Sequence, residues 1–199
     1  KKTEFHAISD SIDSIKRRMA RLDTTLSKEE IARYLASEIT TNAPSLFIRD
    51  LKLKDLIFKI EDYHYKPSNI SLRKKRHKYP SSLVYSYLCF RSSSERKRTE
   101  RARALKKTNN LIVEAILLTG EGTYSNPFKI FSFYEAYYFV KSISNEAHID
   151  GTTFLTKDGK LFAAFKYYNQ TIDEIIILYF DISHLKEFTD LNNVLKEEN

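Results

Sequence analysis

All four glycines of this chain lie between Gly120 and Gly159, and the 119 residues before Gly120 contain none. Glycine reaches positive φ angles without a steric cost, so it marks tight turns and the corners of sheets. A glycine-free stretch with helical periodicity indicates helices, whereas the glycine-bearing remainder indicates strands and hairpins. The sequence therefore predicts a helical part, 1–119, and an α+β part, 120–199, packed together as one compact unit.

The helical part begins with a clear helical period. Apolar residues recur at intervals of four, three, four and three on one face: Ile8, Ile12, Ile15, Met19 and Leu22. Ser27-Lys28-Glu29-Glu30 is a capping box, in which the Ser27 hydroxyl and the Glu30 carboxylate each accept from the other residue's amide. This box predicts a second helix, and Asn42-Ala43-Pro44 predicts the start of a third that runs to about Ile60.

The segment Tyr63–Pro80 interrupts this pattern. It contains two prolines and a run of basic residues, which predicts a mobile surface loop. Ser81 and Ser82 then predict the capped start of a short helix through Phe90. Cys89 lies in this helix as the lone cysteine, which rules out an internal disulfide, and we expect it to pack as a small buried apolar residue.

A longer helix follows. Ser94 is its predicted cap and Leu118 its approximate end, with Gly120 as the left-handed C-terminal stop. In the first turns of this helix, Arg98 and Arg101 occupy the positions where a core-facing stripe would need apolar residues. We therefore expect these turns to project past the core or to stay solvated.

The α+β part changes period after Gly122. Asp158 and Gly159 separate two β-rich runs, and this dipeptide indicates a two-residue hairpin because both positions need positive φ. Gly120 and Gly122 are interpreted as turn residues, because a phosphate loop opens a helix and these glycines follow one. The predicted order is β-α-β-β-β-α with a mainly antiparallel sheet, in the segments 127–131, 132–143, 152–156, 161–168, 174–182 and 183–196.

The net charge of +7 is unevenly distributed. Residues 1–110 contain 26 Lys and Arg against 13 Asp and Glu, whereas residues 111–199 contain 7 against 13. Within the first part, residues 73–107 hold 13 basic residues and only two acidic ones. Binding of a phosphate backbone requires such a density, since its affinity comes from counterion release. The candidate polyanion-binding residues are Arg73, Lys74, Lys75, Arg76, Lys78, Arg96, Lys97 and Arg98.

Aromatic side chains near this cluster could stack on nucleic-acid bases: His77, Tyr79, Tyr85 and Tyr87. The alternative interpretation is a solvated helix end and a loop, with no ligand.

No catalytic, metal or cofactor motif stands out in the sequence. Asp62-Tyr63-His64 and His148-Ile149-Asp150 are the only places where His and Asp are near neighbours, and structural zinc needs four ligands. We therefore expect no catalytic residue, no metal and no cofactor. No apolar run reaches 18 residues, so no transmembrane segment is expected.

Three segments share a pattern with one bacterial family: 19–27 followed by an acid-rich helix start with Tyr34, then 116–130 with the helix start at Ser132, and 178–182. In this order they resemble the uncharacterised family known as domain of unknown function 4919. The sequence departs from the family pattern at Leu22, where the family tends to carry Gly. The resemblance implies tetratricopeptide-like helix pairs joined to a small sheet. It also implies an exported or envelope-associated protein and supplies no catalytic residues.

These observations favour a non-enzymatic interaction module of a bacterial exported or envelope protein, binding a protein or peptide between its helical pairs. The alternative is binding of nucleic acid or another polyanion through residues 73–107. A third hypothesis is an enzyme whose catalytic residues follow no recognisable motif. A periplasmic, envelope or secreted location is favoured by the resemblance, and the cytoplasm stays open.

Overall fold

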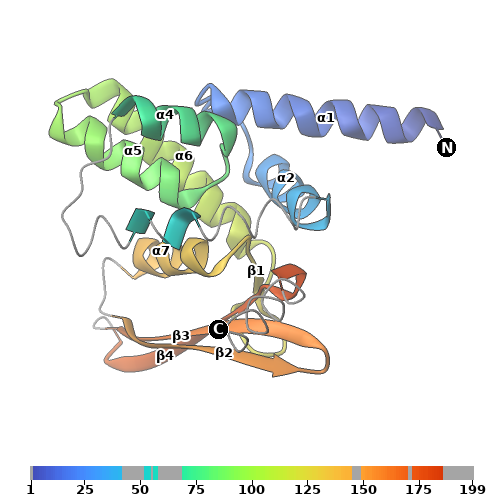
Figure 1. Cartoon of the computed structure of the whole chain (residues 1–199), viewed down its shortest axis with the longest axis vertical. Coiled ribbons are helices and arrows are strands. Elements are labelled where there is room, and N and C mark those ends of the chain that lie inside the picture. The colour runs from blue at the N-terminus through green and yellow to red at the C-terminus, as the bar shows by residue number, and fades with distance from the viewer. Residues whose placement is uncertain are drawn as a thin grey trace, which may run out of the picture. The chain divides into compact units, whose positions relative to one another are not determined.

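The computed structural model describes residues 2–41, 52–54, 56–57, 69–144, 149–169 and 172–185 (Figure 1). Helices come first along the chain, and a sheet with strands of both orientations follows. The predicted α+β fold class is thereby confirmed.

The chain forms two compact units. The helical unit combines Lys1–Ser37 with Ile57–Leu118, and the sheet unit combines Glu38–Leu56 with Thr119–Asn199. The change of unit after Leu118 lies beside Gly120. Residues 38–56 belong with the sheet unit, however, although the sequence placed them in the helical part.

The helical unit is built from α1 (Lys2–Ala20), α2 (Lys28–Thr41), α4 (Asn69–Lys78), α5 (Leu83–Glu95) and α6 (Thr99–Leu117), of which α2 runs on into the other unit. Its core is formed by apolar side chains from all five helices, among them Ile15, Met19, Ile31, Leu72, Leu83, Val84, Leu105 and Ile112. Helix α5 packs against both α4 and α6, and α1 contacts α4.

The turn from α1 to α2 follows local sequence signals. The amide of Ser27 donates to Glu30 Oε2 at 2.8 Å, and the amide of Glu30 donates to Ser27 Oγ at 3.1 Å, which confirms the capping box. Arg18 also crosses the turn, because its guanidinium pairs with both Asp23 and Glu30 at 2.8 Å. These contacts hold the start of α2 against the end of α1.

The spacing predicted that Leu22 continues the apolar face of α1. This is wrong, because the helix ends at Ala20. Its φ is +62°, in the left-handed region that favours glycine. The amide of Leu22 donates to the carbonyl of Met19, and that of Asp23 donates to Arg18, both at 3.0 Å. These two bonds form a Schellman motif, the usual end of a helix at a left-handed residue.

The predicted loop within Tyr63–Pro80 is wrong for the residues described, because Asn69–Lys78 forms α4. Residues 63–68 lie outside the described part. Leu72 and Arg76, four positions apart on one face of α4, are both buried. A cation therefore occupies a core position, and this interrupts the apolar period that would have indicated a helix.

The cap of α5 is as predicted, because Ser82 Oγ accepts from the amide of Tyr85 at 3.3 Å. The predicted Ser94 cap is wrong, because α5 continues through Glu95. The amides of Lys97 and Arg98 donate to the carbonyls of Ser94 and Ser93, and Lys97 has a φ of +56°. Ser94 thus belongs to a Schellman motif that ends α5, and α6 begins at Thr99 without a side-chain cap.

The sheet unit contains β1 (Phe128–Lys129), α7 (Phe133–Ile143), β2 (Ile149–Lys157), β3 (Lys160–Asn169), β4 (Glu174–Asp181) and the short 3-10 helix η1 (Ser183–Leu185). The described strands are ordered β1-β4-β3-β2, with β1 parallel to β4 and the other two pairs antiparallel. The predicted order is confirmed as far as β4. The predicted last helix is seen only as η1, since residues 186–199 lie outside the described part.

Side-chain caps and turns of the sheet unit follow the sequence. Ser132 Oγ accepts from the amide of Glu135 and caps α7. Asp158 and Gly159 have φ angles of +50° and +76°, which confirms the predicted hairpin between β2 and β3. Behind the hairpin, aromatic rings from the strands and α7 form the core, with the Phe165 and Phe180 centroids 5.5 Å apart.

Gly120 was predicted as a left-handed helix stop, and this is wrong. Helix α6 ends with Leu118 as a right-handed cap, and the positive-φ glycines are Gly122 and Gly159. A Cβ on Gly120 would lie 2.3 Å from the carbonyl oxygen of Pro127. The position therefore requires glycine because two backbone segments approach closely there.

Candidate anion-binding site

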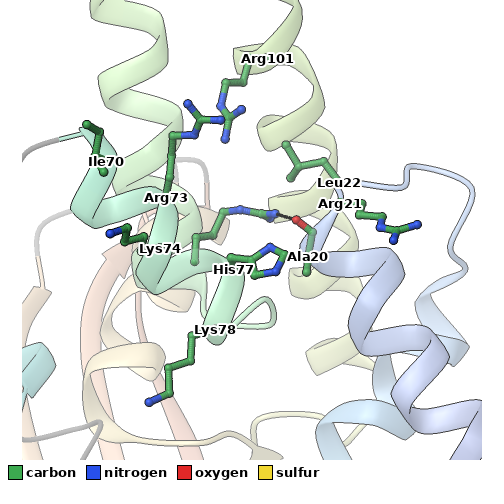
Figure 2. Close-up of a pocket in the computed structure, with 10 residues that line it drawn as sticks. Ala20, Arg21, Leu22, Ile70, Arg73, Lys74, His77, Lys78 and Arg101 are labelled. Carbon is green, nitrogen blue, oxygen red and sulfur yellow. Dashed lines mark hydrogen bonds between the residues drawn. The ribbon is translucent and has the colours of Figure 1, made fainter.

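A pocket of about 720 Å³ lies in the helical unit, between the end of α1, the length of α4 and the first turn of α6 (Figure 2). Its described lining contains six residues of basic type, a histidine and three apolar residues, and no carboxylate. The lining residues are Ala20, Arg21, Leu22, Ile70, Arg73, Lys74, Arg76, His77, Lys78 and Arg101.

One face of α4 supplies half of this lining. Ile70, Arg73, Lys74, His77 and Lys78 recur at intervals of three, one, three and one, the spacing of a single helical stripe. All five side chains are exposed, so this stripe is the solvent-facing side of α4. On α4 it is mostly cationic, so the helix turns a row of positive charges toward the pocket.

Arg76 forms the most buried part of the site, with 2% of its surface exposed. Its guanidinium donates to the carbonyl of Ala20 and, at 3.3 and 3.4 Å, to that of Met19. These are carbonyls at the end of α1 that have no partner within the helix. Burial lowers the pKa of Arg76 to about 10; the neighbouring Cys89 opposes this shift and the charge of Arg101 adds to it. Arg76 therefore holds α4 to α1.

Arg73 and Arg101 are arranged differently. Figure 2 shows their guanidinium groups pointing toward one another from α4 and α6. Burial lowers the pKa of Arg101, and the charge of Arg73 lowers it further. Arg101 Nε is buried and has no hydrogen-bond partner among the described residues. Two like charges and an unsatisfied donor are costly to hold together, and a bound anion would relieve both costs.

Cys89 lies close enough to the site to interact with its charges, but it is a poor nucleophile. Burial raises the pKa of its thiol, although the positive charges of Arg76, Arg101 and Arg73 act in the opposite direction. The side chain is 1% exposed, which confirms the predicted buried cysteine. A protonated, enclosed thiol supports packing and not covalent chemistry.

The predicted cations fall into three groups. Arg73, Lys74, Arg76 and Lys78 line the pocket, whereas Lys75 does not. Arg96, Lys97 and Arg98 are exposed in the turn between α5 and α6 and are also absent from the lining. The expectation that cations of this stretch lie on a loop or a solvated end is wrong for Arg76, which is buried in a helix.

Three lining residues were missed as anion-binding candidates: Arg21, His77 and Arg101. The signal for His77 was present in the sequence, since it lies in the stripe of α4. Arg101 was expected to project past the core, but it is half-buried and lines the pocket, where Arg73 of α4 is close enough to lower its pKa. Its position opposite α4 depends on the packing of both α4 and α6 against α5, which no local pattern indicates.

Two of the four predicted aromatic residues are poorly suited to stacking on bases. Tyr85 is 1% exposed, and Tyr79 stacks on it with ring centroids 5.9 Å apart. The prediction that Tyr85 could stack on a base is therefore wrong, because its ring belongs to the core. His77 is exposed at the pocket.

Other candidate sites are not supported in the described residues. No group of three or more His, Cys, Asp or Glu side chains there could hold a metal ion. His64 and His148 lie outside the described part, and His184 is hydrogen-bonded through Nε2 to the carbonyl of Phe131 at 2.9 Å. In the same residues, no helix combines the length and apolarity needed to cross a bilayer.

No family model matches the chain, and comparison with curated proteins and with solved structures found no significant match. The resemblance to domain of unknown function 4919 stays a prediction.

Proposed function

We propose that this protein binds a polyanion, with nucleic acid as the favoured class, through the pocket between α1, α4 and α6. The observation that carries this proposal is the facing pair of Arg73 and Arg101, with a buried Nε that has no partner among the described residues. Guanidinium groups form bidentate, charge-assisted hydrogen bonds to phosphate, so this pair suits a phosphate group.

The charges around the pair support the same function. Arg73, Lys74 and Lys78 are exposed along one face of α4, and Arg21 is exposed at the end of α1. A concave surface lined by one sign of charge concentrates counterions, and their release by a polyanion drives binding. We expect the contacts to involve phosphates, and base readout to be weak, because Tyr85 is buried and Tyr79 is stacked on it.

The other function expected from the sequence was a module that holds a peptide between helical pairs. Such a groove is normally lined by apolar side chains with polar groups at the rim. By residue type this pocket is mainly basic, with Ala20, Leu22 and Ile70 as the apolar residues of its described lining, although apolar atoms form most of the lining surface. The positive charge of the lining favours the polyanion over the peptide.

The test is the affinity for fluorescently labelled single-stranded DNA, measured by anisotropy over a range of salt concentrations. We expect log Kd to rise linearly with log salt. Replacing both Arg73 and Arg101 by alanine should weaken binding by about tenfold or more, since each lost charge-assisted contact is worth about 1.5–3 kcal/mol.

The matched control is the double variant Arg103→Ala and Lys106→Ala. Both residues are exposed on α6 and lie outside the pocket lining, and replacing them by alanine removes the same total charge as the first double variant. An equal loss of affinity in the two double variants would contradict a role for the pocket. Binding that does not change with salt, or no binding at low salt, would overturn the proposed function.

A further inference from the structure

We propose that Arg73 and Arg101 together bind a terminal phosphate monoester, such as the phosphorylated end of a ligand, in preference to an internal phosphodiester. This inference rests on the proposed function and names the chemical group that its pocket selects. The two guanidinium groups converge from different helices on one place inside the pocket (Figure 2).

The number of charges and donors in the pocket argues for a monoester. A phosphate monoester carries a charge of about −1.5 to −2 at neutral pH and offers three terminal oxygens. An internal diester carries one negative charge and offers two. Two facing guanidiniums bring two positive charges and several N–H groups, and the buried Nε of Arg101 has no hydrogen-bond partner among the described residues. Only the monoester can compensate both charges at once.

Arg76 strengthens the preference for a doubly charged anion through its positive charge. Its N–H groups already donate to the carbonyls of Met19 and Ala20, so it contributes positive potential more than further hydrogen bonds. No described lining residue supplies a carboxylate that would neutralise this potential. An anion with two charges therefore gains more in this pocket than an anion with one charge.

The apolar lining suggests where the rest of the ligand lies. Ile70 is 68% exposed and lines the pocket together with Ala20 and Leu22. These side chains can contact the carbon skeleton to which a terminal phosphate is attached. The 5′-phosphorylated end of a nucleic acid, a free nucleoside monophosphate and a lipid phosphate monoester all share this chemistry.

The first experiment compares two single-stranded oligonucleotides of identical sequence, one with a 5′-phosphate and one with a 5′-hydroxyl. We expect the phosphorylated strand to bind about tenfold more tightly. Replacing Arg73 and Arg101 by lysine keeps the charge but removes the planar fork. This double variant should lose the preference for the 5′-phosphate while it retains salt-dependent binding of the 5′-hydroxyl strand.

Arg103→Lys is the matched control, because Arg103 is exposed on the same helix and lies outside the pocket lining. It should keep the full preference. Equal affinities of the wild-type protein for the two strands would overturn the inference, and so would a preference that survives in the double lysine variant. If salt-dependent binding persists in either case, the proposed function stands without this inference.

A second experiment distinguishes the sources of the phosphate. Adenosine monophosphate, inorganic phosphate and vesicles containing phosphatidic acid are titrated separately against the wild-type protein and the double lysine variant. Binding of any of these in the wild type alone supports the monoester site. If this occurs while neither oligonucleotide binds, the inference stands and the nucleic-acid function fails. The absence of binding by every monoester, the 5′-phosphorylated strand included, overturns the inference.

Discussion

The guanidinium of Arg76 donates a hydrogen bond to the main-chain carbonyl of Ala20, a residue 56 positions earlier in the chain. The bond joins α4 to the end of α1, and both residues line the pocket. It also explains how a cation can be 2% exposed: the last carbonyls of a helix carry partial negative charge and need donors. The pocket therefore combines a structural arginine with two arginines that face each other.

Replacing Arg76 by methionine should destabilise the helical unit. The substitution leaves the carbonyl of Ala20 without its donor and removes the second donor of the Met19 carbonyl, which keeps the amide of Leu22, at a cost of about 1–3 kcal/mol in the free energy of unfolding. Urea denaturation followed by circular dichroism measures this change. Lys75→Met on the same helix is the control and should change stability by less than about 0.5 kcal/mol. Equal effects of the two substitutions would show that the capping bonds do not matter.

Replacing Gly120, Gly159 and Gly151 by alanine should destabilise the protein to decreasing degrees, in this order. Gly120→Ala should cost about 1–3 kcal/mol or more, because the new Cβ would lie 2.3 Å from a backbone oxygen that cannot turn away. Gly159→Ala has open space but a φ of +76°, so about 1–2 kcal/mol is expected. Gly151→Ala has neither constraint and should be nearly neutral. Thermal melts of the three variants test the order, and a destabilised Gly151→Ala with a neutral Gly120→Ala would reverse it.

Cys89 should react slowly with thiol reagents in the native protein at neutral pH. Burial raises the pKa of the thiol and also blocks access to it. The rate of reaction with a chromogenic disulfide, compared in buffer and in denaturant, measures the protection. We expect complete reaction only after unfolding. Rapid modification of the folded protein would mean that the thiol is exposed or ionised.

Asp23 should make the turn between α1 and α2 sensitive to acid. Hydrogen bonds from Arg18 and Thr25 lower the pKa of the Asp23 carboxyl in the folded state well below its ordinary value. Its stabilising contribution is therefore complete above the unfolded pKa, about 3.9, and is lost as the pH falls through the folded pKa.

The measurement for this prediction is the urea midpoint of the wild type and of Asp23→Asn as a function of pH. The wild type should be more stable near neutral pH, and the two midpoints should converge as the medium becomes more acidic than about pH 3.9. A difference between the two urea midpoints that stays constant down to the lowest pH at which the protein folds would contradict the lowered pKa of Asp23.

The parts of the fold predicted correctly depend on short stretches of chain. The box formed by Ser27 and Glu30 spans four residues, and the turn at Asp158 and Gly159 joins two adjacent strands. Their hydrogen bonds and φ angles follow from residue types at fixed spacing, so the sequence contained the information. Helix α4 does not belong to this class: the segment was predicted as a loop, because the buried Arg76 interrupts its apolar period.

The sequence by itself determined the α+β class, the order of elements as far as β4 and the concentration of positive charge in residues 73–107. Only the tertiary structure decided which of those charges meet. Arg73 and Arg101 face each other because α4 and α6 both pack against α5, and Gly120 is required because residues 126–127 pass beside it. Such contacts join residues distant in the chain, where spacing along the sequence carries no signal.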